Sequence, residues 1–173
     1  AEKDGKLEVA ITAYEAALKA SPDYLDAHKN LAAAYKEKNN LPQAILHLEA
    51  VAKAEPNNAD YWNAIGALAM SSRDYPKAVP AFEKANGLKP KDAKLMLALA
   101  DAYKNARQNA RAVETYKKVI AADPKNAEFR ETRGIILAKS GKTRQAITDL
   151  ESAMGAFPDR PRIHEELVDV LAR

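Results

Sequence analysis

The chain has 173 residues, 47% of them hydrophobic and 29% charged, which is long enough for one globular domain with a packed core. Its net charge of +3 comes from basic residues interspersed with acidic ones, which argues against a nucleic-acid-binding protein, because such a protein needs a basic stripe. The absence of cysteine excludes disulfides and cysteine-ligated metals and fits a reducing cytoplasm and a bacterial periplasm equally, and the alanine-rich composition is typical of a bacterial protein.

The elements expected along the chain are short helices joined by turns, and the turns inside the pairs are expected near residues 39–40, 73–74, 107–108 and 140–141. Asp74 suits the start of the helix after its turn, and Pro76 suits a first helical turn. Residues 1–24 are expected to hold the end of one helix at residues 1–3, a turn at residues 4–6, and then the second helix of an incomplete pair, from about Leu7 to Lys19. Four complete helix pairs follow, over residues 25–58, 59–92, 93–126 and 127–160. An unpaired terminal helix occupies residues 161–173, which gives ten helices in a single domain of residues 1–173.

Recurring prolines set the length of these pairs. They lie 34 residues apart without insertion, at Pro22, Pro56, Pro90, Pro124 and Pro158. Each is expected to close the second helix of a pair, because proline cannot donate a backbone hydrogen bond and disfavours helix in the residue before it. A fixed period of this size indicates a repeat architecture.

Other positions of the repeat carry small or aromatic residues. Eight residues before the prolines stand large side chains, namely Tyr14, Leu48, Phe82, Tyr116 and Leu150. Ten residues after them stand mostly small ones, namely Ala32, Gly66, Ala100, Gly134 and Val168. Small residues let two backbones approach, so the two helices of each pair are expected to meet at these positions.

With these residues the chain resembles a tetratricopeptide repeat (TPR) array. The second unit has the fullest signature, with Trp62, Gly66, Ala78, Phe82 and Pro90. The period of 34 residues and the recurring proline favour this family over a related family of RNA-reading helical repeats. The resemblance covers essentially the whole chain and implies an all-α fold, a right-handed α-solenoid (superhelix) of helix-turn-helix units.

Arg133 departs from the repeat. It occupies the position that Leu31, Ile65 and Leu99 hold in other units, where an unpaired charge would be costly. Its own unit carries Asp149 at a position that is not acidic in the other units. We predict an Arg133–Asp149 ion pair.

The resemblance also implies that the first helix of each pair lines a concave groove, which would hold a peptide segment or a protein partner and so act as a scaffold. The residues expected to bind the partner are Lys29, Asn30, Ala33, Lys36, Asn63, Ala67, Met70, Lys94, Leu97, Asp101, Lys104, Glu128 and Glu131. The same reasoning places Thr132, Ile135, Lys139 and Arg162 on this surface. The early part mixes lysine with asparagine, the middle is small and apolar, and the later part is acidic. A solvated polar face with no partner is the alternative interpretation, because any surface helix needs a polar side.

Some TPR domains grip a C-terminal carboxylate with lysine, asparagine and arginine side chains. Lys29 and Lys94 suit this arrangement, but Ala33, Ala64 and Ala98 stand where the asparagines would be. We therefore do not expect such a clamp.

No catalytic, cofactor or metal site is expected. Residues 140–143 read Ser-Gly-Lys-Thr, like the end of a phosphate-binding loop, but Ile136 replaces the required glycine and the segment joins two helices. His28 and His47 can approach each other within one unit, but no third ligand accompanies them. The uncharged run from Tyr61 to Ser72 is too short to cross a bilayer, so no membrane insertion is expected.

A second hypothesis is a homo-oligomerising array that assembles through its open helical ends. The terminal helix is unusually apolar, with Ile163, Leu167, Val168, Val170 and Leu171. A repeat unit cannot cover its own apolar stripe, so such a helix is expected to meet a further repeat of a longer protein or a second copy of the chain.

Overall fold

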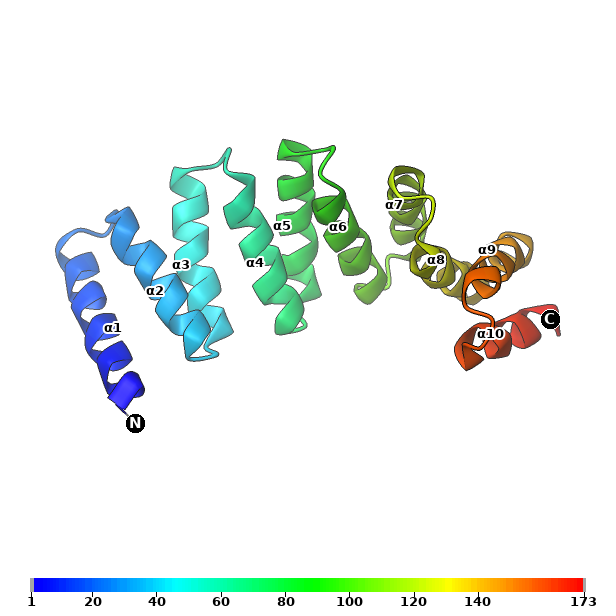
Figure 1. The fold of residues 1–173 in the computed structure, drawn as a ribbon. Coiled ribbons are helices and arrows are strands. Elements are labelled where there is room, and N and C mark those ends of the chain that lie inside the picture. The colour runs from blue at the N-terminus through cyan, green and yellow to red at the C-terminus, as the bar shows by residue number, and fades with distance from the viewer. Residues whose placement is uncertain (1, 173) are drawn as a thin grey trace. The chain divides into compact units, whose positions relative to one another are not determined.

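A computed structural model describes residues 2–172, with side chains from residue 5 onward, and within them it contains ten α-helices and no strand (Figure 1). The helices are α1 (Glu2–Ala20), α2 (Leu25–Glu37), α3 (Leu41–Ala54), α4 (Ala59–Ser71), α5 (Tyr75–Leu88), α6 (Ala93–Asn105), α7 (Asn109–Ala122), α8 (Ala127–Lys139), α9 (Thr143–Ala156) and α10 (Pro161–Leu171). The predicted all-α fold and number of helices are confirmed.

The first helix is longer than expected. α1 is continuous from Glu2, so the predicted turn at residues 4–6 and the separate helix before it are wrong, although residue 1 lies outside the described part. Gly5 lies inside α1, and an added Cβ there would meet no atom within 4 Å. A glycine costs a helix interior only about 1 kcal/mol relative to alanine, which is too little to end a helix by itself.

The helices form two compact units, which we call unit 1 (residues 1–89, α1–α5) and unit 2 (residues 90–173, α6–α10). Within unit 1, each helix packs on the next from α1 to α5. Within unit 2 the same holds from α6 to α10, and α10 also contacts α8. Contacts between successive helices are the packing pattern of helical repeats.

A left-handed residue follows the first helix of each complete pair. These residues are 34 positions apart, Asn39, Arg73, Arg107 and Gly141, with φ of 56°, 58°, 58° and 72°. The next residue donates its N–H to a carbonyl five residues back, as from Asn40 to Tyr35 (2.8 Å). This is a Schellman cap, which satisfies the last carbonyls of the helix and reverses the chain. The four turns predicted at these positions are confirmed.

Side chains cap the starts of α3, α4, α5, α6 and α8. Asp74 accepts a hydrogen bond from the N–H of Lys77 at the start of α5, and Pro76 occupies the first turn, as the sequence suggests. Asn58 accepts in the same way from the N–H of Asp60 at the start of α4. Each cap satisfies a backbone donor that has no partner within its helix.

The two helices of a pair meet where small residues were predicted. A Cβ added to Gly66 would lie 2.9 Å from ring atoms of Phe82, and one added to Gly134 would lie 2.9 Å from Cγ of Leu150. Alanine suffices at the equivalent positions Ala32 and Ala100, which are buried. The large side chain eight residues before the proline thus packs directly on the small residue of the preceding helix.

A ring nitrogen also ties each of three first helices to the proline before it. Trp62 Nε1 donates to the carbonyl of Pro56 at 3.0 Å. His28 Nε2 and His164 Nε2 lie 2.9 Å and 2.5 Å from the carbonyls of Pro22 and Pro158. Tryptophan and histidine share this repeat position because both can place an N–H there.

Candidate functional site

In unit 1, α2 presents the first part of the predicted groove. Lys29 is engaged by Glu55, with Nζ 2.9 Å from Oε1, and this hydrogen bond is the main reason why its pKa is raised. The Asn30 amide donates to the carbonyl of Asp26 on the same helix (2.7 Å). Ala33 and Lys36 are exposed and lie about one and two turns further along α2.

The matching part of α4 is small and apolar. Asn63 and Met70 are half-buried and Ala67 is exposed. Spacings of four and three residues place the three on one face of the helix. Unit 1 therefore exposes Ala33 and Lys36 on α2 and Ala67 on α4.

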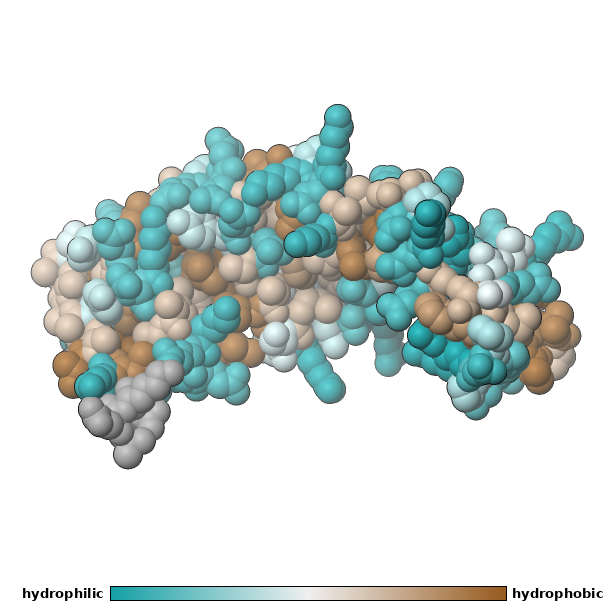
Figure 2. All heavy atoms as spheres, in the orientation of Figure 1, coloured by the Kyte–Doolittle hydropathy of each residue, from teal (hydrophilic) through white to brown (hydrophobic). Residues whose placement is uncertain are grey.

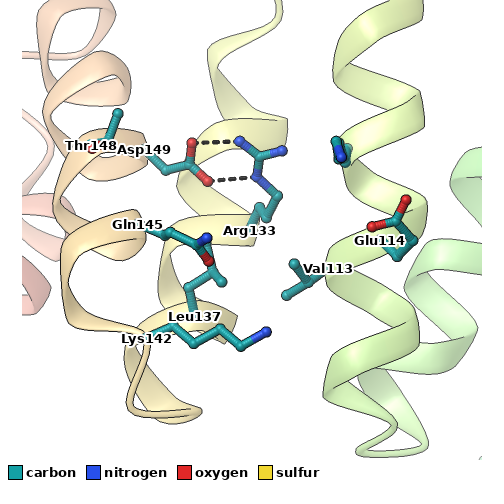
Figure 3. A pocket seen from close by; sticks show the side chains of 9 residues that line it. Val113, Glu114, Arg133, Leu137, Lys142, Gln145, Thr148 and Asp149 are labelled. Carbon is teal, nitrogen blue, oxygen red and sulfur yellow. Dashed lines mark hydrogen bonds and ion pairs between the residues drawn. The ribbon is translucent and has the colours of Figure 1, made fainter.

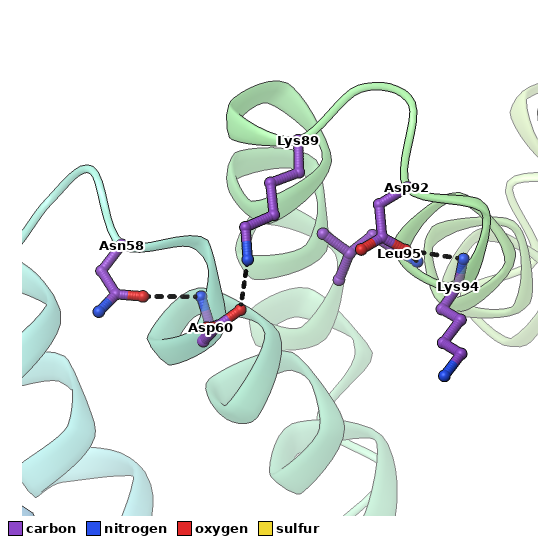
Figure 4. Close-up of polar contacts among 6 residues, drawn as sticks. All are labelled: Asn58, Asp60, Lys89, Asp92, Lys94 and Leu95. Carbon is purple, nitrogen blue, oxygen red and sulfur yellow. Dashed lines mark hydrogen bonds and ion pairs between the residues drawn. The ribbon is translucent and has the colours of Figure 1, made fainter.

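In unit 2, α6 continues the set. Lys94 is exposed; its backbone N–H is taken by Asp92, and its side chain points away from that contact (Figure 4). Leu97 is half-buried. Asp101 Oδ1 accepts hydrogen bonds from Tyr116 Oη at 2.5 Å and from Lys104 Nζ at 2.7 Å. Burial and this contact with Asp101 raise the pKa of Tyr116.

The acidic part of the predicted surface is neutralised within unit 2. Glu131 is buried and forms an ion pair with Arg160. Glu128 is exposed and lies 3.6 Å from the same guanidinium, which also stacks 4.0 Å from the centre of the Phe157 ring. Sequence reasoning missed Arg160. Asp60 and Lys89 of unit 1 form another ion pair between a first helix and the end of its pair (Figure 4). Lys89 precedes its proline, whereas Arg160 follows Pro158, so comparison of the units gave no signal for Arg160.

A basic pocket of about 500 Å³ opens over α8 in unit 2, and we call it the α8 pocket. Its lining residues are Lys104, Arg107, Asn109, Thr132, Ile135, Ile136, Lys139 and Arg162. The sequence predicted the surface position of Lys104, Thr132, Ile135, Lys139 and Arg162. It missed Arg107 and Asn109, because these lie in and just after a turn that was read only as a turn.

A second pocket of about 390 Å³ lies between α7 and α9, with α8 behind it (Figure 3). On its wall Arg133 Nε and Nη2 donate to the two carboxylate oxygens of Asp149, at 2.6 Å and 2.7 Å. This bidentate contact confirms the predicted ion pair, and it raises the pKa of Arg133. Glu114 and Lys117 also line this pocket, so its charges are mixed.

The predicted approach of two histidines is confirmed in unit 1. The Nδ1 atoms of His28 and His47 lie 2.9 Å apart, and the ring of Tyr35 stacks on His47. Burial, and then the neighbouring His28, lower the pKa of His47. The described residues contain no group of three side chains that could hold a metal ion, and none of their helices is long and apolar enough to cross a membrane.

Helical hairpins with this period, these caps and these close contacts define a TPR-type solenoid, and solved structures agree. YrrB, described as a TPR protein with an unusual peptide-binding site, matches with a TM-score of 0.75 at 20% identity over 95% of this chain and 84% of that chain. MamA from Desulfovibrio magneticus RS-1 matches with a TM-score of 0.74 at 19% identity, over 86% of this chain and 84% of the other. Likeness at these identities establishes the fold.

Sequence comparison gives the family. The family model of the Cytochrome c-type biogenesis protein H TPR domain matches residues 52–161, and a tetratricopeptide repeat model matches residues 1–68. The chain belongs to the tetratricopeptide repeat family, within the group that the first of these models describes. A comparison with curated proteins found no match. Both fold and family are those of protein-interaction scaffolds.

Proposed function

We propose that the chain is a non-catalytic scaffold that binds a peptide segment of a protein partner on the faces of its first helices. The observation that carries this proposal is the open surface of unit 1. Ala33 and Lys36 are exposed on α2, and the exposed Ala67 shares one face of α4 with Asn63 and Met70. Alanine leaves room for a peptide backbone, the asparagine amide can both donate to it and accept from it, and methionine adapts to an apolar side chain.

Two of the comparisons bear on the kind of partner. YrrB is described as having a peptide-binding site, which supports peptide recognition by this fold. The name of the matching family refers to cytochrome c-type biogenesis, so proteins of that process are the first natural partners to test.

Selection from a random peptide library tests the proposal without knowledge of the partner. The bait is the full chain, and the counter-bait is a face variant that combines Lys36→Glu, Ala67→Glu and Lys94→Glu at exposed positions of α2, α4 and α6. The control variant combines Lys84→Glu, Lys118→Glu and Ala121→Glu, which changes the charge equally at exposed positions of second helices. Selected peptides should bind the wild type and the control variant and lose about tenfold or more in affinity for the face variant. Equal binding to all three proteins would remove the proposal.

Self-association is a second candidate, and one observation favours it. Val168 and Leu171 on α10 are 66% and 68% exposed, and Figure 2 shows hydrophobic atoms at the surface beside α10. Sedimentation at rising concentration should then show an oligomer in the wild type and a monomer in Val168→Gln/Leu171→Gln. A wild type that stays monomeric at all concentrations would exclude this candidate.

A further inference from the structure

The α8 pocket concentrates positive charge. Its lining residues include four cations and, among the residues that the structure describes, no carboxylate. Lys104 pairs with Asp101, whereas within the described part of the chain the side chains of Arg107, Lys139 and Arg162 form no ion pair or hydrogen bond. The whole chain carries a net charge of only +3, so this is a local feature.

Three acidic residues of α6 and α8, which stand close in sequence to residues of the pocket, have partners of their own. Asp101 is held by Lys104 and Tyr116, and both Glu131 and Glu128 face Arg160. Arg107, Lys139 and Arg162 therefore remain available to an external anion. Arginine is well suited to a carboxylate because its planar guanidinium can donate two parallel hydrogen bonds.

The base of the pocket is apolar. Ile135 and Ile136 are each only 5% exposed, whereas Arg107, Lys139 and Arg162 are exposed, so the cations surround an aliphatic floor. Thr132 and Asn109 add hydrogen-bonding groups to the wall. A phosphate or an oligonucleotide would use the cations and leave the isoleucines uncovered. A peptide that places an acidic side chain beside an aliphatic one would use both.

We propose that the α8 pocket selects partners by binding an internal peptide motif in which aspartate or glutamate adjoins an aliphatic residue. This rests on the proposed function and specifies the chemistry of its peptide. The volume of about 500 Å³ suits one or two side chains, so the pocket would be a specificity site on the larger peptide-binding surface. The attraction is electrostatic and close to solvent, so it weakens as salt screens it.

The test uses the full chain labelled with ¹⁵N and a short peptide blocked at both ends, with Glu-Ile-Glu in a glycine-serine background. NMR titration should shift amide signals of α8 and of the turn at Arg107. Matched Gln-Ile-Gln and Glu-Ser-Glu peptides should bind at least about tenfold more weakly, and added sodium chloride should weaken the Glu-Ile-Glu complex. Arg107→Glu/Lys139→Glu should abolish these shifts, whereas Lys84→Glu/Lys118→Glu should not.

Several results would overturn the inference. Absence of binding by Glu-Ile-Glu would do so, as would equal binding of Gln-Ile-Gln. A glycine-serine peptide that ends in isoleucine with a free carboxyl group is the next comparison. If it bound better than the Glu-Ile-Glu peptide, the pocket would bind the C-terminal carboxylate of a partner instead of an internal motif. An oligothymidylate that displaced the peptide and bound more tightly would assign it to nucleic acid.

Library peptides separate this inference from the proposed function. Peptides that lose binding to the face variant but not to Arg107→Glu/Lys139→Glu would remove the inference and leave the proposed function standing. Peptides that are insensitive to both variants would remove both.

Discussion

At the residue scale, Arg133 and Asp149 form two charge-assisted hydrogen bonds at positions where the second unit has the apolar Ile65 and Ala81. The carboxylate is 5% exposed, so neither charge can be left without the other. Asp149→Ala is expected to lower the free energy of unfolding by about 3–5 kcal/mol, because it strands the guanidinium. Urea unfolding followed by circular dichroism measures this loss.

The matched control restores what other units have at these positions. Arg133→Ile with Asp149→Ala reproduces the Ile65 and Ala81 combination of the second unit. This double variant should recover most of the lost stability, since a buried ion pair and a packed apolar pair differ little in net energy. A double variant as unstable as the single one would show that the pair has a role beyond compensating Arg133.

The histidine pair predicts how the stability of unit 1 depends on pH. The pKa of His47 lies below its ordinary value of 6.5, so in acid the unfolded chain binds a proton that the folded chain resists. Stability is therefore expected to fall as pH decreases from about 7.5 to 5.5, even though Glu15 opposes the shift in pKa. His47→Ala, which copies Ala81 of the next unit, should have a flatter profile in urea unfolding at several pH values. Parallel profiles for the two proteins would contradict the prediction.

At the scale of elements, each hairpin depends on the fit between a small residue and a large one. Gly66→Ala is expected to cost about 1–3 kcal/mol, because its Cβ would lie 2.9 Å from the buried Phe82 ring, and this outweighs the better helix propensity of alanine. Adding Phe82→Leu should restore stability, because Ala32 and Leu48 already form that combination. Thermal and urea unfolding test both.

An exposed glycine of the next helix supplies the control. Gly87 in α5 has no atom within 4 Å of an added Cβ, so Gly87→Ala should stabilise the chain by about 0.5–1 kcal/mol. Stabilisation by Gly66→Ala as well would mean that α4 and α5 can separate without loss.

Much of the fold could be predicted because equivalent positions in successive repeat units carry residues of the same kind. Comparing one unit with another predicts the contact of Gly66 with Phe82 and the turn at Arg73. It also predicts the pairing of Arg133 with Asp149. The start of α1 could not be predicted in this way, because Gly5 holds the repeat position of the left-handed residues Asn39 and Arg73, yet α1 continues through it as a helix. The ion pairs on the candidate surface could not be predicted either. The rotamers of long side chains decide that Arg160 pairs with Glu131 and that Lys104 pairs with Asp101.

At the scale of the whole molecule, helices contact their neighbours in sequence within each of the two units, so a disturbance is expected to fade along the chain. Asp149→Ala should accelerate amide hydrogen exchange most in α8 and α9 and least in α1 to α3. Exchange measured by mass spectrometry on the intact chain checks this gradient, with Gly66→Ala as the counterpart in unit 1. Uniform acceleration over all ten described helices would instead indicate one cooperative block.

A non-glycine residue in a left-handed turn lowers the stability of the fold, but its side chain can contribute to binding. Arg107 has φ of 58°, a conformation that costs most L-residues about 1 kcal/mol and glycine almost nothing, and its side chain lines the α8 pocket. Arg107→Gly should therefore make the chain harder to unfold and, if the pocket binds acidic motifs, worse at holding them. Arg73→Gly, at the equivalent turn of unit 1, should give the first effect alone. A protein engineered for heat resistance at every such turn would lose ligand discrimination at one of them.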